Sequence, residues 1–414
     1  MPQVPVVSKK KSNSHHFSTS RPIASMAQHI HVGDAAEEAI LDNELISAKM
    51  SVRGGPYTQD AFPNQPVHET MTLAALIGSN FALNPDMVWK TCEGEEYEFI
   101  RGVVWNDDPA GLLFEDLDYT NSKLSFGDMW GKAFLARKEG FPGNFLSMFT
   151  PREENITARS HFGDLQFLHG MASSEGERPL VTKAKIMMWL EIMYKLALGG
   201  QGIGPDTQLQ DVTTRGTSQL KSFFYDKTVP NGKATLRLLL GNNGGKNLTK
   251  YMGYNVQSRA LGSCFHLIQD AYAYGHIRRT LVNEKDCIDR GIYSMVHAPL
   301  NLSTDHFSAH IKMRDGIADH WGDIENFHTY KGQDSDEHTH YDHAGINIEN
   351  MTNLGDRDQF NGMAGVRDGI EQCIVLANFW KAETPWEGDN NVEKWLSDTV
   401  FKLSENVSSA NHDI

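Results

Sequence analysis

The hydrophobic positions of this chain recur mainly at helical spacing. An almost continuous apolar stretch from Lys183 to Leu198 ends at Gly199-Gly200 and predicts a helix buried on all sides. A shorter helix is predicted from His68 to Ala82, and another long one from Arg259 to Arg279. Apolar positions between residues 361 and 381 predict an amphipathic last helix that closes the core.

The segments between these helices are polar or rich in glycine. Residues 199 to 255 are dominated by Gly, Asn, Thr and Gln, and Thr235 to Leu240 is a strand candidate within them. Residues 301 to 342 predict a histidine-rich loop. No internal repeat or clear linker interrupts residues 34 to 414, so we expect a single large all-α domain there.

The composition is that of an ordinary globular protein, with 40% hydrophobic and 22% charged residues in 414. Residues 1 to 33 are rich in serine, contain no acidic residue and predict a disordered tail, with a transit peptide as the alternative. The sequence has neither a cleavable secretory signal nor an apolar run of about 18 residues. We therefore expect a cytoplasmic protein, or one exported by a signal-independent route, such as a secreted virulence effector that acts on host membranes.

The formal net charge is −15. Proteins that bind nucleic acid usually present a basic surface, so this charge argues against a nucleic-acid partner and against tight attachment to anionic membranes. Bound metal ions would reverse the sign locally. The four cysteines form no CxxC pair and predict buried free thiols rather than a disulfide framework: Cys92, Cys264, Cys287 and Cys373.

Three ionisable residues lie in the apolar stretch from Cys264 to Arg279. His266 and Asp270 are four residues apart, which places them on one helix face, and His276 follows after Gly275. A helical His–Asp pair at this spacing is usually a surface pair, but burial of ionisable groups without a partner costs several kcal/mol. Imidazole and carboxylate ligands suit zinc or a similar divalent ion. The stretch therefore predicts a metal site.

The spacing His, three residues, Asp, five residues, His resembles the central motif of the zinc-dependent phospholipase C and single-strand-specific zinc nuclease superfamily. The flanking motifs of that family are matched in the same order over roughly residues 65 to 345. They are an early histidine, a carboxylate after Trp105, a histidine before Phe162, and a later His–Asp pair: His68, Asp107, His161, His338 and Asp342. The motifs are more similar to the bacterial and fungal phospholipase C branch than to the nucleases.

This resemblance implies an all-α domain around two or three zinc ions, with Asp270 bridging two of them. One zinc would be held by Asp107, His161, His266 and Asp270, the second by His276, His338 and Asp342, and a third by His68 and the shared Asp270. The implied activity is that of a phospholipase C that cleaves glycerophospholipids such as phosphatidylcholine at a membrane surface, giving diacylglycerol and a phosphorylated head group. The alternatives are a single-strand-specific zinc nuclease and a non-enzymatic helical protein with a structural zinc site.

Several choices stay open in the sequence. Asp108 competes with Asp107 as ligand and as general base, and His169 competes with His161 because it would lie on much the same face of a continuous helix. His340 and His343 compete with His338. Secreted members of the family use an N-terminal tryptophan as a ligand, and no tryptophan precedes Trp89 here. The sequence indicates no oligomeric state and no head-group preference.

Overall fold

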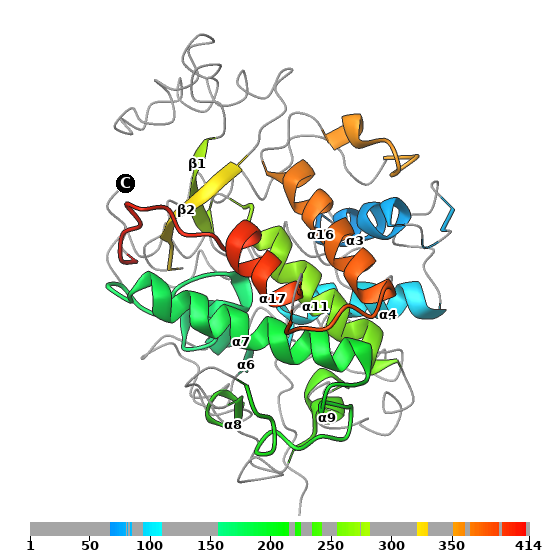
Figure 1. Ribbon diagram of the computed structural model, residues 1–414, viewed down its shortest axis with the longest axis horizontal. Coiled ribbons are helices and arrows are strands. Elements are labelled where there is room, and N and C mark those ends of the chain that lie inside the picture. Colours follow the sequence, from blue (N-terminus) through cyan, green and yellow to red (C-terminus); the bar gives the residue numbers. More distant parts are fainter. Residues whose placement is uncertain are drawn as a thin grey trace, which may run out of the picture.

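The protein is mostly helical in the part of the chain that the structure describes (Figure 1). The structure is a computed structural model. It describes residues 67–79, 81, 83–84, 94–109, 156–214, 220–224, 234–241, 255–273, 275–281, 321–329, 351–360, 365–388 and 391–410. The predicted tail, residues 1 to 33, lies outside these ranges, and the extent of the domain from residue 34 stays a prediction. No helix among the described residues is long and apolar enough to cross a membrane.

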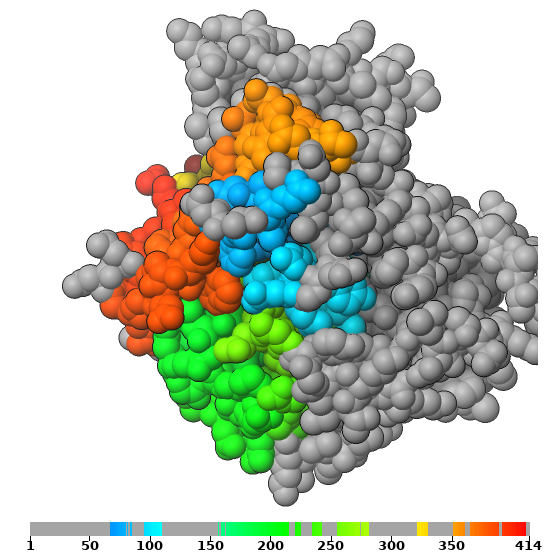
Figure 2. Space-filling model, turned by 90° about the vertical axis from the view of Figure 1, so that its right-hand side faces the viewer, coloured from blue at the N-terminus to red at the C-terminus, as the bar shows by residue number. Residues whose placement is uncertain are grey.

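Helix α11, Val256–Asp270, forms the centre of the fold. It packs against α4 (Gly94–Trp105), α7 (Pro179–Leu198), α16 (Val366–Lys381) and α3 (Val67–Gly78) (Figure 1). On one face of the molecule α16 lies beside α3, and α3 beside α4 (Figure 2). Because helices cover α11 on several sides, nearly all of its side chains are buried, including the polar ones.

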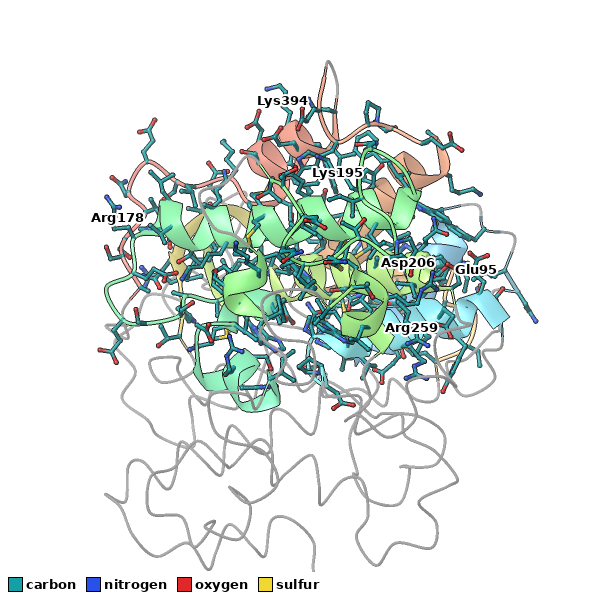
Figure 3. All side chains as sticks on the ribbon, turned by 90° about the horizontal axis from the view of Figure 1, so that it is seen from below. Glu95, Arg178, Lys195, Asp206, Arg259 and Lys394 are labelled. Atoms are coloured by element: carbon teal, nitrogen blue, oxygen red, sulfur yellow. The ribbon has the colours of Figure 1, made fainter. Side chains whose placement is uncertain are left out.

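The N-terminal end of α11 is fixed by local hydrogen bonds and by α4. The side chain of Asn255 accepts hydrogen bonds from the backbone N–H groups of Gln257 and Ser258, as an N-cap does. Ser258 Oγ donates to Glu95 Oε1 at 2.9 Å, and the buried guanidinium of Arg259 pairs with Glu98. Figure 3 shows Glu95 and Arg259 at the same end of the α4–α11 pair.

Two glycines let α4 and α11 approach each other closely. A Cβ atom on Gly102 would lie 2.1 Å from the carbonyl oxygen of Arg259, and one on Gly262 would lie 2.3 Å from that of Phe99. Real Cβ atoms essentially never come within 3.0 Å of such atoms. The contact is therefore backbone on backbone, and it sets the distance between the side chains at the far ends of the two helices.

Helix α7 confirms the prediction of a deeply buried helix. It begins with a proline at its first turn and ends at Gly199, whose φ of 69° lies in the left-handed region. Its central residues are buried, and Trp189 stacks on Trp105 of α4 with ring centroids 5.3 Å apart. The indole N–H of Trp189 donates to Ser263 Oγ of α11 at 3.0 Å.

Two strands follow α11 in the described part of the chain. β1 (Ile277–Leu281) pairs antiparallel with β2 (Trp321–Phe327), with register shifts on either side of Arg279. Arg279 is buried; it donates to the carbonyl oxygens of Ala271, Gly322 and Val400, and its guanidinium lies 4.3 Å from the centroid of the Tyr272 ring. This one cation joins the end of α11, the sheet and the C-terminal segment.

Three predicted elements are wrong in extent or type. The helix predicted from Arg259 to Arg279 ends at Asp270, because the backbone hydrogen bonds tighten to i−3 at Tyr272 and Ala273 and the chain then turns into β1. The strand candidate Thr235 to Leu240 is instead helix α9, Leu236–Gly241, since leucine is a strong helix former and Thr235 Oγ1 accepts from the N–H of Leu238. The stretch from 301 to 342, predicted to be rich in loops, contains the strand β2, which the sequence analysis did not predict.

The remaining elements are short. They are α6 (Ile156–Phe162), η5 (Gln166–His169), α8 (Leu220–Phe223), η7 (Arg357–Phe360), α17 (Val392–Trp395) and η8 (Leu396–Val400). Helix α3 confirms the short helix predicted from His68, although it ends at Gly78 and not at Ala82, and α16 confirms the predicted last amphipathic helix. Of these elements α6 and η5 matter most for function, because each carries a histidine toward the C-terminal end of α11.

Candidate metal centre

The structure brings six of the eight predicted metal ligands together at the C-terminal end of α11. His68 comes from α3, Asp107 from the turn after α4, His161 from α6, and His276 from the turn before β1; all four are buried. His266 and Asp270 lie in the last turns of α11 and are buried as well. His338 and Asp342 lie outside the described residues.

The first group consists of His68, His266 and Asp270, whose ligand atoms lie within 4.8 Å of one another. His266 Nε2 is 2.8 Å from Asp270 Oδ2, and His68 Nε2 is 3.3 Å from Asp270 Oδ1. The two imidazole rings stack with centroids 4.3 Å apart. Each oxygen of Asp270 therefore faces a different histidine.

The second group is Asp107, His161 and His169, also within 4.8 Å. Asp107 Oδ1 lies 3.8 Å from His161 Nε2 and 3.7 Å from His169 Nδ1. The third group, within the same limit, is His169, Asp270 and His276. Asp270 Oδ2 lies 3.2 Å from His169 Nδ1 and 3.7 Å from His276 Nδ1. His169 and Asp270 thus each belong to two groups, so the three groups form one connected cluster.

The cluster histidines are also held by contacts outside the groups. His266 Nδ1 donates to the carbonyl oxygen of Val103 at 2.7 Å, and His276 Nδ1 donates to that of His169 at 2.9 Å. His161 Nδ1 lies 3.0 Å from Ser160 Oγ, and His68 Nδ1 lies 2.7 Å from Gln269 Oε1. Metal-ligating histidines typically make such a bond with the ring nitrogen that does not bind the metal, which fixes the ring orientation.

The two carboxylates are stabilised as anions. Burial alone would raise the pKa of Asp107, but the charge of His266, a hydrogen bond from His161 and the charges of His169 and His68 lower it to about 2. Burial opposes ionisation of Asp270 in the same way, and the charges of His266, His276 and His68 hold its pKa well below the usual value. At neutral pH the cluster therefore contains two buried negative charges close together.

The histidines respond in opposite directions. Burial lowers the pKa of His169 to about 4 and lowers that of His68, so both are neutral at pH 7. For His266 the charges of Asp270 and Asp107 outweigh burial and raise the pKa. Neutral imidazole is the form that binds metal ions. A metal cation at this place would balance the charge of the two carboxylates.

The donor set fits a divalent metal ion. It consists of nitrogen and oxygen ligands that are buried and converge from separate elements, and the three groups contain no thiol although Cys264 lies in the same helix. Such N/O sets are typical of zinc and of other first-row divalent ions. The coarse prediction of a metal-binding cluster thus agrees with the geometry of the described residues, while the identity of the ion belongs to the proposal below.

Two choices left open by the sequence take a definite form in the structure. Asp107, not Asp108, contributes to a group, although Asp108 is buried too. His161 and His169 both belong to the group with Asp107, because the helix that carries His161 ends at Phe162 and His169 lies in the separate helix η5. His169 was not among the ligands predicted from the sequence. The feature that pointed to it was its spacing of eight residues from His161.

Comparison of the chain with protein-family models, with curated proteins and with solved structures gives no match. Its function is therefore inferred from the chemistry of this cluster and from the motif that the sequence contains.

Proposed function

We propose that this protein is a zinc-dependent phosphodiester hydrolase of the phospholipase C type. The observation that carries the proposal is the burial of two carboxylates, Asp107 and Asp270, among five histidines at the end of one helix. Burial of two like charges is unfavourable unless cations neutralise them. Two cations held at such a place are a common arrangement for phosphodiester hydrolysis.

Asp270 is suited to hold two cations close together. Its Oδ1 faces His68, and its Oδ2 faces His266, His169 and His276, so the two oxygens point at different histidines. Ions in two-metal sites are typically about 3.5–4 Å apart, a distance that needs a shared anionic ligand. We assign Asp270 as the bridging ligand, with His169 as a further ligand beside the six predicted residues.

The reaction adds water across the bond between phosphorus and the glycerol oxygen, and the leaving oxygen takes up a proton. When bound, zinc lowers the pKa of a coordinated water to roughly 7 and polarises the phosphoryl group. Asp107, which faces the histidines with both of its oxygens, is assigned to hold the metal and to orient the attacking water. His338 and Asp342 remain proposed ligands of the second ion.

The charge of the chain favours a phospholipid over a nucleic acid. A net charge of −15 repels a polyanion over many contacts, whereas one zwitterionic head group meets little repulsion. The expected substrates are choline or ethanolamine glycerophospholipids at a membrane surface.

Metal analysis and a substrate comparison test the proposal. Protein purified without chelator should contain at least two equivalents of zinc, and it should release diacylglycerol from phosphatidylcholine vesicles faster than it degrades single-stranded DNA. One equivalent of zinc or none would remove the two-metal mechanism. Faster degradation of DNA would establish a nuclease, and bound zinc with neither activity would establish a structural site.

The substitution Asp270→Asn isolates the bridging residue. It keeps the size of the side chain but removes the charge, so zinc content should fall and activity should drop at least about a thousandfold, which corresponds to several kcal/mol of transition-state stabilisation. The matched control is Asp211→Asn, at an exposed aspartate outside the three groups, which should behave as wild type. An Asp270→Asn protein that keeps most of its activity would show that the cluster is not catalytic.

A further inference from the structure

Gln269 contacts one of the proposed ligands directly. Its Oε1 lies 2.7 Å from Nδ1 of His68, while the other ring nitrogen of His68, Nε2, lies 3.3 Å from Asp270 Oδ1. A neutral imidazole has one N–H, and the partner of one nitrogen decides whether the other is a donor or an acceptor. The end of the Gln269 amide that faces His68 therefore decides which nitrogen of His68 has a lone pair for a metal.

The structure orients the Gln269 amide with its oxygen toward His68 and its nitrogen toward Thr72. Its Nε2 lies 3.0 Å from Thr72 Oγ1, and the amide donates to this hydroxyl. With the nitrogen used in this way, Oε1 is the atom that faces His68 Nδ1.

We propose that Gln269 is a positioning residue: its side-chain oxygen holds the proton of His68 on Nδ1, so that the Nε2 lone pair faces Asp270 and the metal. The assignment of His68 as a ligand rests on the proposed function, whereas the tautomer of the ring does not. Gln269 directly precedes Asp270 in α11, and His68 and Thr72 lie four residues apart on one face of α3. One amide therefore joins α3 to α11 next to the bridging carboxylate.

Two variants and one control test this role in the full-length protein. Gln269→Leu removes the acceptor, and Gln269→Glu restores an acceptor for the Nδ1 proton. Gln257→Leu makes the same change as the first variant in the first turn of α11, away from the three groups. The tautomer of His68 is measured in chelated, histidine-labelled protein by nitrogen NMR, with His68→Asn to assign its signals. Zinc affinity is measured by competition with a chelating dye.

In wild type, Gln269→Glu and Gln257→Leu, His68 should carry its proton on Nδ1, and zinc affinity should agree within about threefold. In Gln269→Leu the Nδ1–H form should no longer dominate, and zinc affinity should fall about 10- to 100-fold, as is typical when the partner of a ligating histidine is lost. Circular dichroism checks that each variant is folded.

Three results would overturn the proposal. They are an Nε2–H tautomer of His68 in wild type, an unchanged tautomer of His68 in Gln269→Leu, or the absence of the Nδ1–H tautomer of His68 in Gln269→Glu. A failure of the proposed function would give a different result. Wild type would then bind no zinc, while the tautomer of His68 would still differ between Gln269→Leu and wild type as predicted.

Discussion

The close contact between α4 and α11 links the stability of the fold to the geometry of the candidate metal centre, and Gly262→Ala tests that link. The added Cβ would lie 2.3 Å from the carbonyl oxygen of Phe99 and 2.8 Å from the backbone of Gly102 and Val103. These are main-chain atoms inside a helix and cannot move alone. Since real Cβ atoms stay at least 3.0 Å away, the helices must separate by about 0.7 Å.

The separation of the helices would affect the candidate metal centre through one hydrogen bond. His266 lies four residues after Gly262 on the same face of α11, and its Nδ1 donates to the carbonyl oxygen of Val103 at 2.7 Å. A shift of about 0.7 Å stretches this bond to about 3.4 Å, beyond the usual range for N–H···O bonds. Overpacking costs about 1–3 kcal/mol and the lost hydrogen bond about 1 kcal/mol, so we expect a loss of about 2–4 kcal/mol in the free energy of unfolding.

Urea unfolding and zinc titration measure the two consequences. Besides the lower stability, zinc affinity should fall about 10- to 100-fold because His266 loses the contact that orients its ring. The matched control is Gly200→Ala, which adds the same methyl group at a glycine with nothing within 4 Å of the new Cβ and should change neither quantity. Wild-type stability in Gly262→Ala would refute the close packing. Reduced stability with unchanged zinc affinity would refute the link to the centre.

Further predictions concern the ion, the buried cation and the thiols. Zinc added to chelated protein at a hundred times its Kd should stabilise the fold by about 2.7 kcal/mol, seen as a rise in Tm; no rise would mean that the folded state does not bind it preferentially. Arg279→Met leaves three carbonyl oxygens without the buried guanidinium, so the free energy of unfolding, measured in urea, should fall by about 3 kcal/mol or more. Arg178→Met, at an exposed arginine at the start of α7 (Figure 3), should lower it little. Equal losses in the two variants would contradict the role of Arg279. Burial raises the pKa of both Cys264 and Cys373, so mapped alkylation at pH 8 should modify neither before unfolding, and rapid labelling of either would contradict its burial.

The sequence was informative where a ligand pattern is local. His266 and Asp270 are one helical turn apart, so their common face follows from helix geometry alone, and the structure places them 2.8 Å apart. The buried helix α7 was predictable for a similar reason, because a segment that is apolar on all sides has to be covered. Neither inference needs contacts between distant parts of the chain.

The contribution of His169 could not be predicted in this way. The comparison with His161 assumed one continuous helix, in which residues eight apart lie on much the same face. The chain instead ends α6 at Phe162 and forms η5 four residues later, so the two histidines reach the cluster from separate elements with ring centroids 4.8 Å apart. The break depends on tertiary packing, which overrides local periodicity. The role of Gln269 was hidden for the same reason, since its partner His68 is 201 residues away in sequence.

The position of Asp270 is itself unfavourable for a purely structural residue. The C-terminal end of a helix has a partial negative charge, which repels a carboxylate, and burial adds the cost of desolvation. Asp270 is the last residue of α11 and is almost fully buried, with Asp107 as a second buried anion in the same cluster. Uncharged side chains of similar size would avoid both costs. Positive charge at this place offsets these costs, and the five histidines that converge there could hold a metal ion that supplies it.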